Sequence, residues 1–503
     1  MESKIFMGDM PELMENILNN LNNEFDSLYS CTLVSRHWCK MSIPFLWQDP
    51  FSLETSPLFI SKYLSSLGED EKYSLKECGL NAEFSKTLFV YAKFLKVLDL
   101  SRLIWVTWKY LKLVKKSIFY NDPSINLLIN LLFKLFMESG ATLHKSVLYV
   151  STEINPEIFN LLEQNKQFFS QLQDLSLSVK SEFSTKNGTK LLKILAKNTT
   201  KINALKLENF RSDCEPELFH DLISIIKSQV QLRRFSIIGE EIPMEFHGMI
   251  SSLKSQTSSL HEVIIRYCGY SAEFEILKDC KNLETLCIRH CDHRKLLKTL
   301  NCSKLSTLEI FDSQIDALTI VQILEKSGSL LQRLALASAS QKFWNEPLIL
   351  ETLKSFCQNL TYLHILNTGF STQLIELIGN LQKLQFLKLW CNNYIPEEEL
   401  KIRIKQFAEI LPMTLQYLDL LGDARLSSYI DILLNHCNAP LNKLIIDRLD
   451  NEKNIKALIE FCIRNRTLNY VGVNRYLNLD DNIRKEVETY VALVPYERII
   501  VDC

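Results

Sequence analysis

Cysteine and histidine are the residues in this sequence that could bind a metal, and they gather most tightly near residue 290. Cys287, His290, Cys291 and His293 fall within one short stretch, so zinc binding is the first chemistry to consider. No two of the 14 cysteines have the C-x-x-C spacing that is typical of zinc and redox sites. Cys287 also stands in an alternating apolar segment, which would point it away from the turn residues that follow. We therefore favour reduced, packed thiols and expect no metal and no cofactor.

Motifs for catalysis are absent from the sequence. There is no Gly-rich phosphate loop, no G-x-S-x-G nucleophile elbow and no set of RING-type zinc ligands. His261, His290 and His364 stand in different repeats, and none has a paired nucleophile nearby in the sequence. We therefore predict no catalytic residue and do not expect the chain to be an enzyme by itself.

The composition narrows the classes of partner. The 503 residues are 47 % hydrophobic and 23 % charged, with a net charge of −2. A nearly neutral chain gives no electrostatic reason to expect nucleic acid or anionic membrane as a partner. The most apolar segment, residues 125–136, is too short to span a bilayer and suits a buried helix. With no secretory signal at its start, we expect a cytoplasmic or nuclear protein.

A repeat organises most of the chain and must position any site. In each copy an apolar residue is followed by others three and five positions later, and consecutive copies start 22 to 31 residues apart. The twelve copies begin at Leu172, Ile202, Leu232, Leu260, Leu283, Leu305, Leu331, Leu360, Leu384, Leu415, Leu441 and Leu468. This period is typical of leucine-rich repeats, in which a short strand is followed by a helix. The sequence thus predicts an α/β leucine-rich-repeat solenoid, with a curved parallel sheet inside and helices outside.

Helical periodicity and the positions of other copies suggest three regions. Residues 1–50 form a helical head, residues 51–171 hold irregular repeats with copies near Leu95 and Val147, and residues 172–503 form a solenoid of about twelve repeats. Within the repeats, segments 217–230, 399–411 and 454–463 have apolar residues at helical spacing. In the head, we predict a first helix from Pro11 and a second that carries Leu28 to Trp38 and ends before Pro44. Residues 497–503 are predicted to be a last strand.

The head resembles an F-box. That pattern opens with Leu-Pro, continues with an apolar helix and a Val-Ser-Arg-x-Trp stretch, and closes with Pro-x-Leu-Trp. The matching residues are Met10 (in place of Leu) and Pro11, then Leu13, Ile17, Leu18 and Leu21, then Leu33, Val34, Ser35, Arg36 and Trp38, and finally Pro44, Leu46 and Trp47. With cysteine-containing repeats after it, the whole chain resembles the F-box/leucine-rich-repeat family.

This resemblance implies partners and a function. It implies a substrate receptor of a Skp–cullin–F-box ubiquitin ligase, whose F-box docks on a Skp-type adaptor and through it on cullin and RING subunits. The repeats would hold a protein substrate that the sequence does not identify, so that its lysines reach the ubiquitin thioester. The residues expected to contact the adaptor are Met10, Pro11, Leu13, Ile17, Leu18, Val34, Trp38 and Trp47. Two alternatives stay open: a protein-binding scaffold without ubiquitin transfer, and a sensor of a small ligand.

The repeat also predicts a surface. Residues at offsets 2, 4 and 6 from each start alternate with the core residues and would face the concave side of the sheet. Three successive repeats place on that side Tyr362, His364, Leu366, Phe386, Lys388, Trp390, Tyr417, Asp419 and Leu421. Because parallel strands lie ~4.8 Å apart, we expect these nine side chains to form one patch.

Charged residues occupy the same face in the preceding repeats. They are Arg234, Glu262, Arg266, Arg289, Glu309 and Arg333. We hypothesise a basic-rimmed groove, with Arg266 and Arg289 in it, that leads to the aromatic patch and suits an acidic or phosphorylated peptide with an apolar anchor. The alternative is that the aromatic residues only pack along the sheet, or that a loop or the C-terminal tail covers them.

Overall fold

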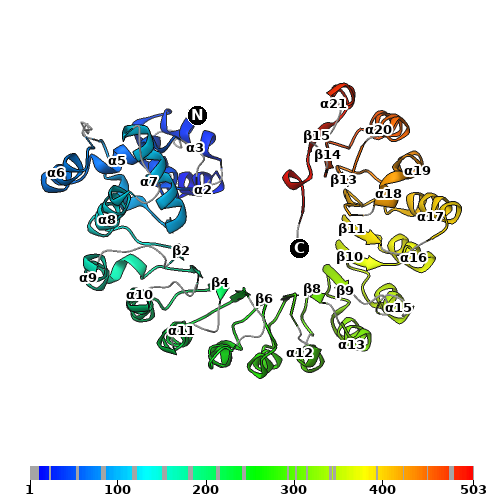
Figure 1. Cartoon of the computed structure of the whole chain (residues 1–503), viewed down its shortest axis with the longest axis horizontal. Coiled ribbons are helices and arrows are strands. Elements are labelled where there is room, and N and C mark those ends of the chain that lie inside the picture. The colour runs from blue at the N-terminus through cyan, green and yellow to red at the C-terminus, as the bar shows by residue number, and fades with distance from the viewer. Residues whose placement is uncertain are drawn as a thin grey trace. The chain divides into compact units, whose positions relative to one another are not determined.

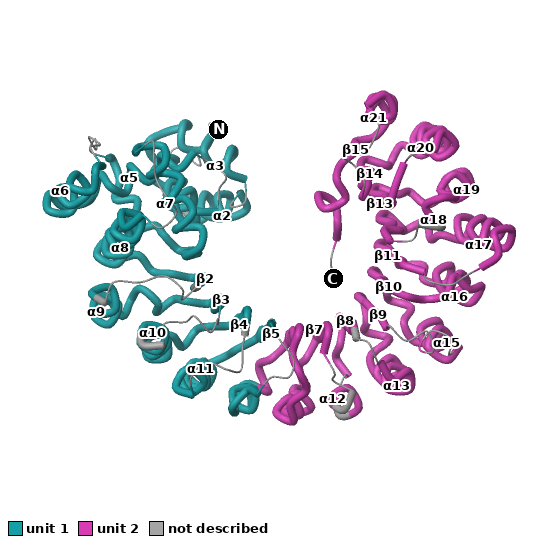
Figure 2. The backbone as a smooth tube through the Cα atoms, in the orientation of Figure 1, with its two compact units in different colours: residues 1–240, 245–256 teal, residues 241–244, 257–503 magenta. Residues whose placement is uncertain are grey.

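The computed structural model describes most of the chain between Pro11 and Val501. The described residues are 11–21, 24–52, 56–80, 87–115, 122–149, 156–178, 185–210, 216–240, 245–291, 294–300, 303–312, 315–338, 343, 347–391, 395–422, 424–449, 451–474 and 481–501. They form two compact units (Figure 2): residues 1–240 with 245–256, and residues 241–244 with 257–503. We call these unit 1 and unit 2.

Unit 1 begins with three head helices and continues with strands that alternate with helices. Its elements are α2 (Pro11–Asn20), α3 (Phe25–Thr32), α4 (Arg36–Leu46), η1 (Pro57–Phe59), α5 (Ile60–Leu64), α6 (Glu69–Glu77), η2 (Tyr91–Phe94), β1 (Val97–Asp99), α7 (Leu100–Lys115), α8 (Pro123–Glu138), β2 (Lys145–Tyr149), α9 (Pro156–Gln164), η3 (Lys166–Phe169), β3 (Asp174–Ser178), α10 (Thr185–Asn198), β4 (Ala204–Phe210), α11 (Pro216–Ser228), β5 (Arg234–Gly239) and η4 (Ser251–Gln256). Strands β1 to β5 pair in parallel and in sequence order.

Unit 2 repeats the strand–helix alternation to the end of the described chain. Its elements are β6 (Glu262–Arg266), η5 (Ala272–Asp279), β7 (Thr285–Arg289), α12 (Arg294–Thr299), β8 (Thr307–Asp312), α13 (Ala317–Ser327), β9 (Arg333–Ser338), α15 (Pro347–Phe356), β10 (Tyr362–Thr368), α16 (Thr372–Asn380), β11 (Phe386–Cys391), α17 (Glu397–Ile410), β12 (Tyr417–Asp419), α18 (Ala424–Ser428), α19 (Ile430–His436), β13 (Lys443–Ile446), α20 (Glu452–Arg464), β14 (Tyr470–Val473), α21 (Asp481–Glu488), β15 (Ala492–Pro495) and η7 (Tyr496–Arg498). Strands β6 to β15 pair in parallel, again in sequence order. Within this unit the strands line the inner side and the helices lie outside (Figure 1).

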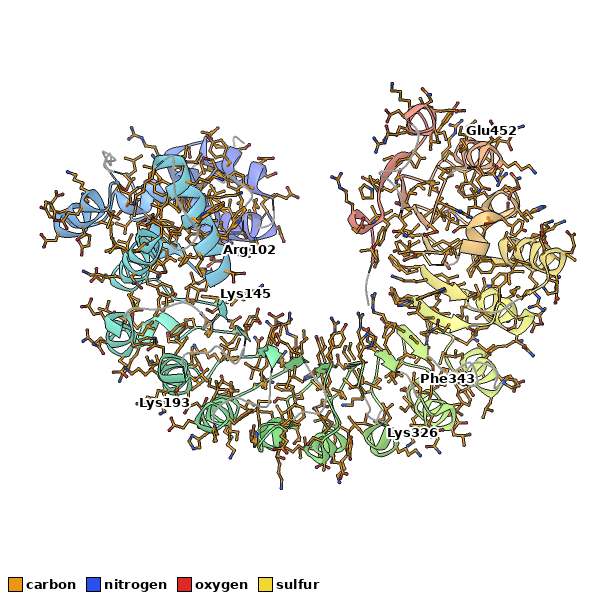
Figure 3. All side chains as sticks on the ribbon, viewed as in Figure 1. Arg102, Lys145, Lys193, Lys326, Phe343 and Glu452 are labelled. Carbon is orange, nitrogen blue, oxygen red and sulfur yellow. The ribbon has the colours of Figure 1, made fainter. Side chains whose placement is uncertain are left out.

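The predicted leucine-rich-repeat fold is confirmed. Each of the twelve predicted copies supplies one strand, from β3 to β14. The residues at offsets 3 and 5 are buried in every copy, as Leu363 and Ile365 of β10 illustrate. Burial of this apolar ladder between sheet and helices is the main stabilising contribution, at roughly 25 cal/mol per Å² of apolar surface. Outward positions on the helices carry charges such as Lys193 and Lys326 (Figure 3).

The structure corrects three expectations about elements. The second head helix is two helices, α3 and α4, and the hydroxyl of Ser35 caps α4 by accepting a hydrogen bond from the Trp38 N–H at 3.2 Å. Pro44 lies inside α4 instead of ending it. The last strand is β15, and the chain then forms the short helix η7 where we predicted a strand from residue 497. Residues 502–503 lie outside the described part.

A left-handed residue recurs at the ends of four strands, either within the last two residues or directly after them, and the sequence analysis did not predict it. Asn209, Tyr267, His290 and Asn367 all have φ between 50° and 60°, and each lies seven positions after its repeat start. This kink turns the chain inward, so that the next residue is buried, as Cys268 and Cys291 are. Asparagine adopts this conformation readily, which makes Asn209 and Asn367 the detectable signal.

Among the described residues, no helix is both long enough and apolar enough to cross a bilayer. The apolar segment 125–136 instead lies in α8, where most of its side chains are buried.

Candidate functional site

The head has a small apolar core of its own. Met14 and Leu18 of α2, Leu28 of α3 and Trp38 of α4 are buried together. Leu18 and Trp38, which we expected at the adaptor, therefore pack inside the head. Met10 lies outside the described residues, and Pro11 begins α2.

Trp47 attaches the head to the rest of unit 1. Its ring stacks on Tyr91, with the centroids 4.0 Å apart, and meets Tyr63 edge-on at 5.2 Å. The carbonyl of Gln48 accepts hydrogen bonds from the backbone N–H groups of Lys96 and Val97, both at 2.9 Å, next to β1. Trp47 thus packs against residues of unit 1 outside the head, a structural role that the sequence did not indicate.

Apolar side chains remain exposed on the head. Leu33 and Val34, between α3 and α4, are 71 % and 53 % exposed, and Leu13 of α2 is 38 % exposed. Phe25 and Tyr29 are also exposed, and with Leu33 they follow one face of α3 because they are spaced by four residues. Ile17 is half-buried. Of the residues predicted to contact the adaptor, Leu13 and Val34 are therefore the most accessible to a partner.

A cavity lies between the head and the first strands of unit 1. Its volume is about 400 Å³, and its lining residues include Leu28, Phe45, Asp49, Lys96 and His144. Burial raises the pKa of the Asp49 carboxyl, which a hydrogen bond from Ser52 partly offsets. Burial, with Lys96 nearby, lowers the pKa of His144. The cavity was not foreseen from the sequence because its walls come from elements that are distant along the chain.

The pairing of β10, β11 and β12 brings the residues of the predicted patch together on the inner face of unit 2. Tyr362, Phe386 and Tyr417 are direct neighbours on β10, β11 and β12. Their rings are tilted against one another, with centroids 6.3 Å and 5.8 Å apart. In the next rows, His364, Lys388 and Asp419 are neighbours, and Leu366 lies beside Trp390.

A buried ion pair lies within the patch. The Lys388 ammonium lies 3.3 Å from the fully buried carboxylate of Asp419. That carboxylate also accepts hydrogen bonds from the Tyr417 hydroxyl at 3.3 Å and from the Leu421 N–H at 2.9 Å. Burial, followed by the nearby Asp419, raises the pKa of Tyr417 well above its usual value. The Tyr417 hydroxyl therefore stays protonated and oriented.

The C-terminal segment covers much of this patch. Ile499 is buried against Tyr417 and Ile445, and Val501 also packs on this cluster. Tyr362 and Tyr417 are consequently only 1 % exposed, which is the covered arrangement that we gave as an alternative. Trp390 stays 40 % exposed, so part of the patch is open.

The arginines beside the patch have partners on the same face. Arg289 pairs with the buried carboxylate of Glu309, and its guanidinium lies 5.0 Å from the centre of the Phe311 ring. Arg266 lies beside Cys287, with its Nη2 atom 3.9 Å from the sulfur. Arg333 lies over the Tyr362 ring at 4.4 Å. Glu309 therefore offsets the positive charge of Arg289 in this groove, whereas the contacts of Arg266 and Arg333 are with neutral groups.

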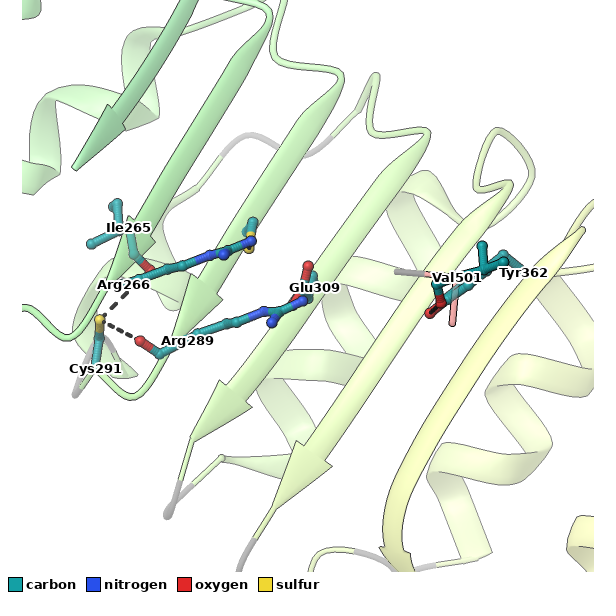
Figure 4. Close-up of polar contacts among 8 residues, drawn as sticks. Ile265, Arg266, Arg289, Cys291, Glu309, Tyr362 and Val501 are labelled. Atoms are coloured by element: carbon teal, nitrogen blue, oxygen red, sulfur yellow. Dashed lines mark hydrogen bonds and ion pairs between the residues drawn. The ribbon is translucent and has the colours of Figure 1, made fainter. Parts of the chain in front are cut away.

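The cysteines of the predicted cysteine–histidine stretch pack as part of the repeat. The Cys291 thiol donates to the carbonyls of Arg289 and Ile265, at 3.0 Å and 3.7 Å (Figure 4), and accepts from the Cys268 N–H at 3.3 Å. Cys287 lies on β7, and His293 is outside the described residues. Within the described ranges, no group of three metal-binding side chains comes together. The cysteines there are free thiols.

Comparison with known proteins gives similarity of structure only. No family model and no curated protein matches the sequence. A solved structure described as the Rad7 and Elc1 complex in yeast is similar over 79 % of this chain and 93 % of that chain, with 15 % identity and a TM-score of 0.37. A TLR13–ssRNA13 complex is similar over 72 % of this chain, with 15 % identity and a TM-score of 0.31. This chain spans 52 %, about half, of that TLR13 chain.

Proposed function

We propose that this protein is the substrate-recognition subunit of a Skp–cullin–F-box ubiquitin ligase. In this proposal the head docks on a Skp-type adaptor, and the inner face of the repeats binds the protein substrate. The chain contributes no nucleophile, and it accelerates transfer by holding the substrate near the ubiquitin thioester.

The observation that carries the proposal is the match of residues 10–50 to the F-box pattern. Its geometry supports the same function, because Leu13 on α2 and Leu33 and Val34 in the turn between α3 and α4 are exposed apolar side chains. Exposed apolar groups of this kind are typical of protein-binding surfaces. A small head that already has its own core does not need these side chains for folding.

Copurification with a Skp-type adaptor tests the proposal. The change is Leu33→Asp together with Val34→Asp, which puts charge into the docking surface while leaving the buried Trp38 and Leu18 in place. We expect adaptor binding to weaken at least about 100-fold, because burying an unpaired carboxylate costs several kcal/mol. The measurement is adaptor recovered with the full chain, alongside its melting temperature.

Val230→Asp is the matched control, because Val230 is an exposed valine of unit 1 outside the head. It should bind the adaptor like the unchanged chain. If the unchanged chain recovers no Skp-type adaptor, the function is instead that of a protein-binding scaffold without ubiquitin transfer.

A further inference from the structure

The C-terminal segment is seated on the inner face of unit 2 in a specific way. Residues 496–501 follow β15 and run back over the strands, and their apolar side chains belong to one cluster with Tyr417, Ile445, Phe386 and Leu421. Glu497 and Arg498 are exposed, whereas Ile499 is only 6 % exposed. The sheet thus contacts the apolar side of this segment and leaves its charges in solvent.

Two tyrosine hydroxyl groups contact the backbone of one residue in the segment. The Tyr362 hydroxyl donates to the Val501 carbonyl at 3.4 Å (Figure 4), and the Tyr417 hydroxyl accepts from the Val501 N–H at 3.3 Å. The Tyr417 hydroxyl can accept in this way because its own proton points to Asp419. These contacts use groups that every non-proline residue has, so they do not depend on the side chain of Val501.

A glycine makes room for the segment. Gly472 lies on β14 beside Ile445 of β13, at a position where the inner face otherwise carries side chains. A Cβ atom there would lie 3.0 Å from the Cδ1 atom of Ile499 and 3.0 Å from the Cα atom of Tyr496. Both distances are shorter than ordinary carbon contacts, so a side chain at residue 472 would crowd the segment and glycine leaves it room.

We propose that this surface is a peptide-binding site for a β-branched apolar segment of a partner protein, and that residues 496–501 occupy it in cis. The proposal rests on the proposed function, since it identifies the class of substrate segment that the repeats bind. The site combines apolar contacts at Ile445 and Phe386 with backbone contacts at the two tyrosines. A partner segment with the same chemistry would displace the tail and could extend to the exposed Trp390.

Binding of a labelled peptide tests this proposal with the full chain. The probe is fluorescein-labelled Val-Pro-Tyr-Glu-Arg-Ile-Ile-Val, the sequence of residues 494–501, and the measurement is fluorescence polarisation. Ile499→Asp should release the cis segment, because a buried carboxylate has no partner there. Since a tethered segment competes at an effective concentration near millimolar, we expect the probe to bind this variant about tenfold or more tightly than the unchanged chain.

Two variants serve as controls. Arg498→Asp places the same acid at the neighbouring exposed position and should bind the probe like the unchanged chain. Adding Gly472→Val to Ile499→Asp should abolish the gain, because the new side chain fills the space of the probe's first isoleucine. If Ile499→Asp keeps a cooperative melting transition and binds the probe no better than the unchanged chain, the proposal is wrong.

A second measurement covers the case in which Ile499→Asp does not fold. Hydrogen exchange of residues 496–501 in the unchanged chain should speed up as the probe is added, since the tail is displaced. No change at saturating probe would overturn the proposal. Neither assay involves the adaptor, so failed adaptor binding and failed peptide binding are separate outcomes.

Discussion

At the scale of single residues, His364 shows how the inner face fixes the charge of its side chains. It is only 7 % exposed, lies against the Phe311 ring at 5.2 Å, and its Nε2 atom has no hydrogen-bond partner among the described residues. Burial, with Lys388 and Arg289 nearby, lowers the pKa of His364 to about 3. The imidazole is therefore neutral at neutral pH, while Glu309 and Asp419 neutralise the two cations.

The pKa of His364 predicts a loss of stability in mild acid. The unfolded chain protonates this histidine near pH 6.5 and the folded chain only near pH 3, so its contribution is complete above pH 6.5 and declines as the pH falls toward 3. Between pH 7 and pH 5 the unchanged chain should lose about 2 kcal/mol more unfolding free energy than His364→Leu. Urea unfolding at both pH values measures this. Equal losses in the unchanged chain and in His364→Leu would contradict this explanation.

At the scale of elements, buried glutamines close the turns before two strands of unit 1. The side-chain carbonyl of Gln229 accepts from the Ile202 N–H at 2.9 Å, and that of Gln256 accepts from the Leu232 N–H at 3.0 Å. The side-chain amide of Gln256 then donates to the backbone carbonyl of Gln229 at 2.9 Å. Gln229 stands three residues before its repeat start, where Cys280 and Cys357 stand in other repeats, so polar and thiol side chains share one buried position.

Replacing Gln229 with leucine should destabilise unit 1. The substitution keeps the volume roughly constant but leaves the Ile202 N–H buried without an acceptor, which costs about 1–3 kcal/mol. Chemical unfolding with a probe in unit 1 is the measurement. Gln231→Leu, at an exposed position two residues later, should change the unfolding free energy by less than about 0.5 kcal/mol. Equal effects of the two substitutions would contradict the hydrogen-bond explanation.

The repeat allowed most strands and helices to be predicted from the sequence. The features that were missed depend on a local helix break or on contacts between residues that are far apart in the sequence. Period and alternation located the strands β3 to β14 and their buried residues, because these depend on neighbouring positions. The break between α3 and α4 was missed because Leu33 and Val34 are apolar and continue the helical pattern, although both are exposed. Coverage of the patch by the tail was only an alternative in the sequence analysis, and the contacts themselves could not be derived, since Val501 contacts tyrosines 84 and 139 residues away in the sequence.

At the scale of the molecule, each unit carries one candidate protein-binding surface. Unit 1 presents the exposed apolar residues of the head, and unit 2 presents the patch that the tail partly covers. The contacts of Trp47 and Gln48 with Tyr91, Lys96 and Val97 join the head to the strands that follow. Deleting residues 1–50 would remove these contacts, so a test of the head needs point substitutions.

Such a test distinguishes binding from degradation in cells. We expect proximity labelling, with the proteasome blocked, to recover the same partner proteins with the unchanged chain and with the Leu33→Asp, Val34→Asp chain, because the substitutions leave unit 2 intact. With the proteasome active, those partners should fall in abundance only with the unchanged chain, since proximity to the ubiquitin thioester requires the adaptor. Quantitative mass spectrometry measures both. Partners that are degraded equally with either chain would contradict a receptor function that acts through the head.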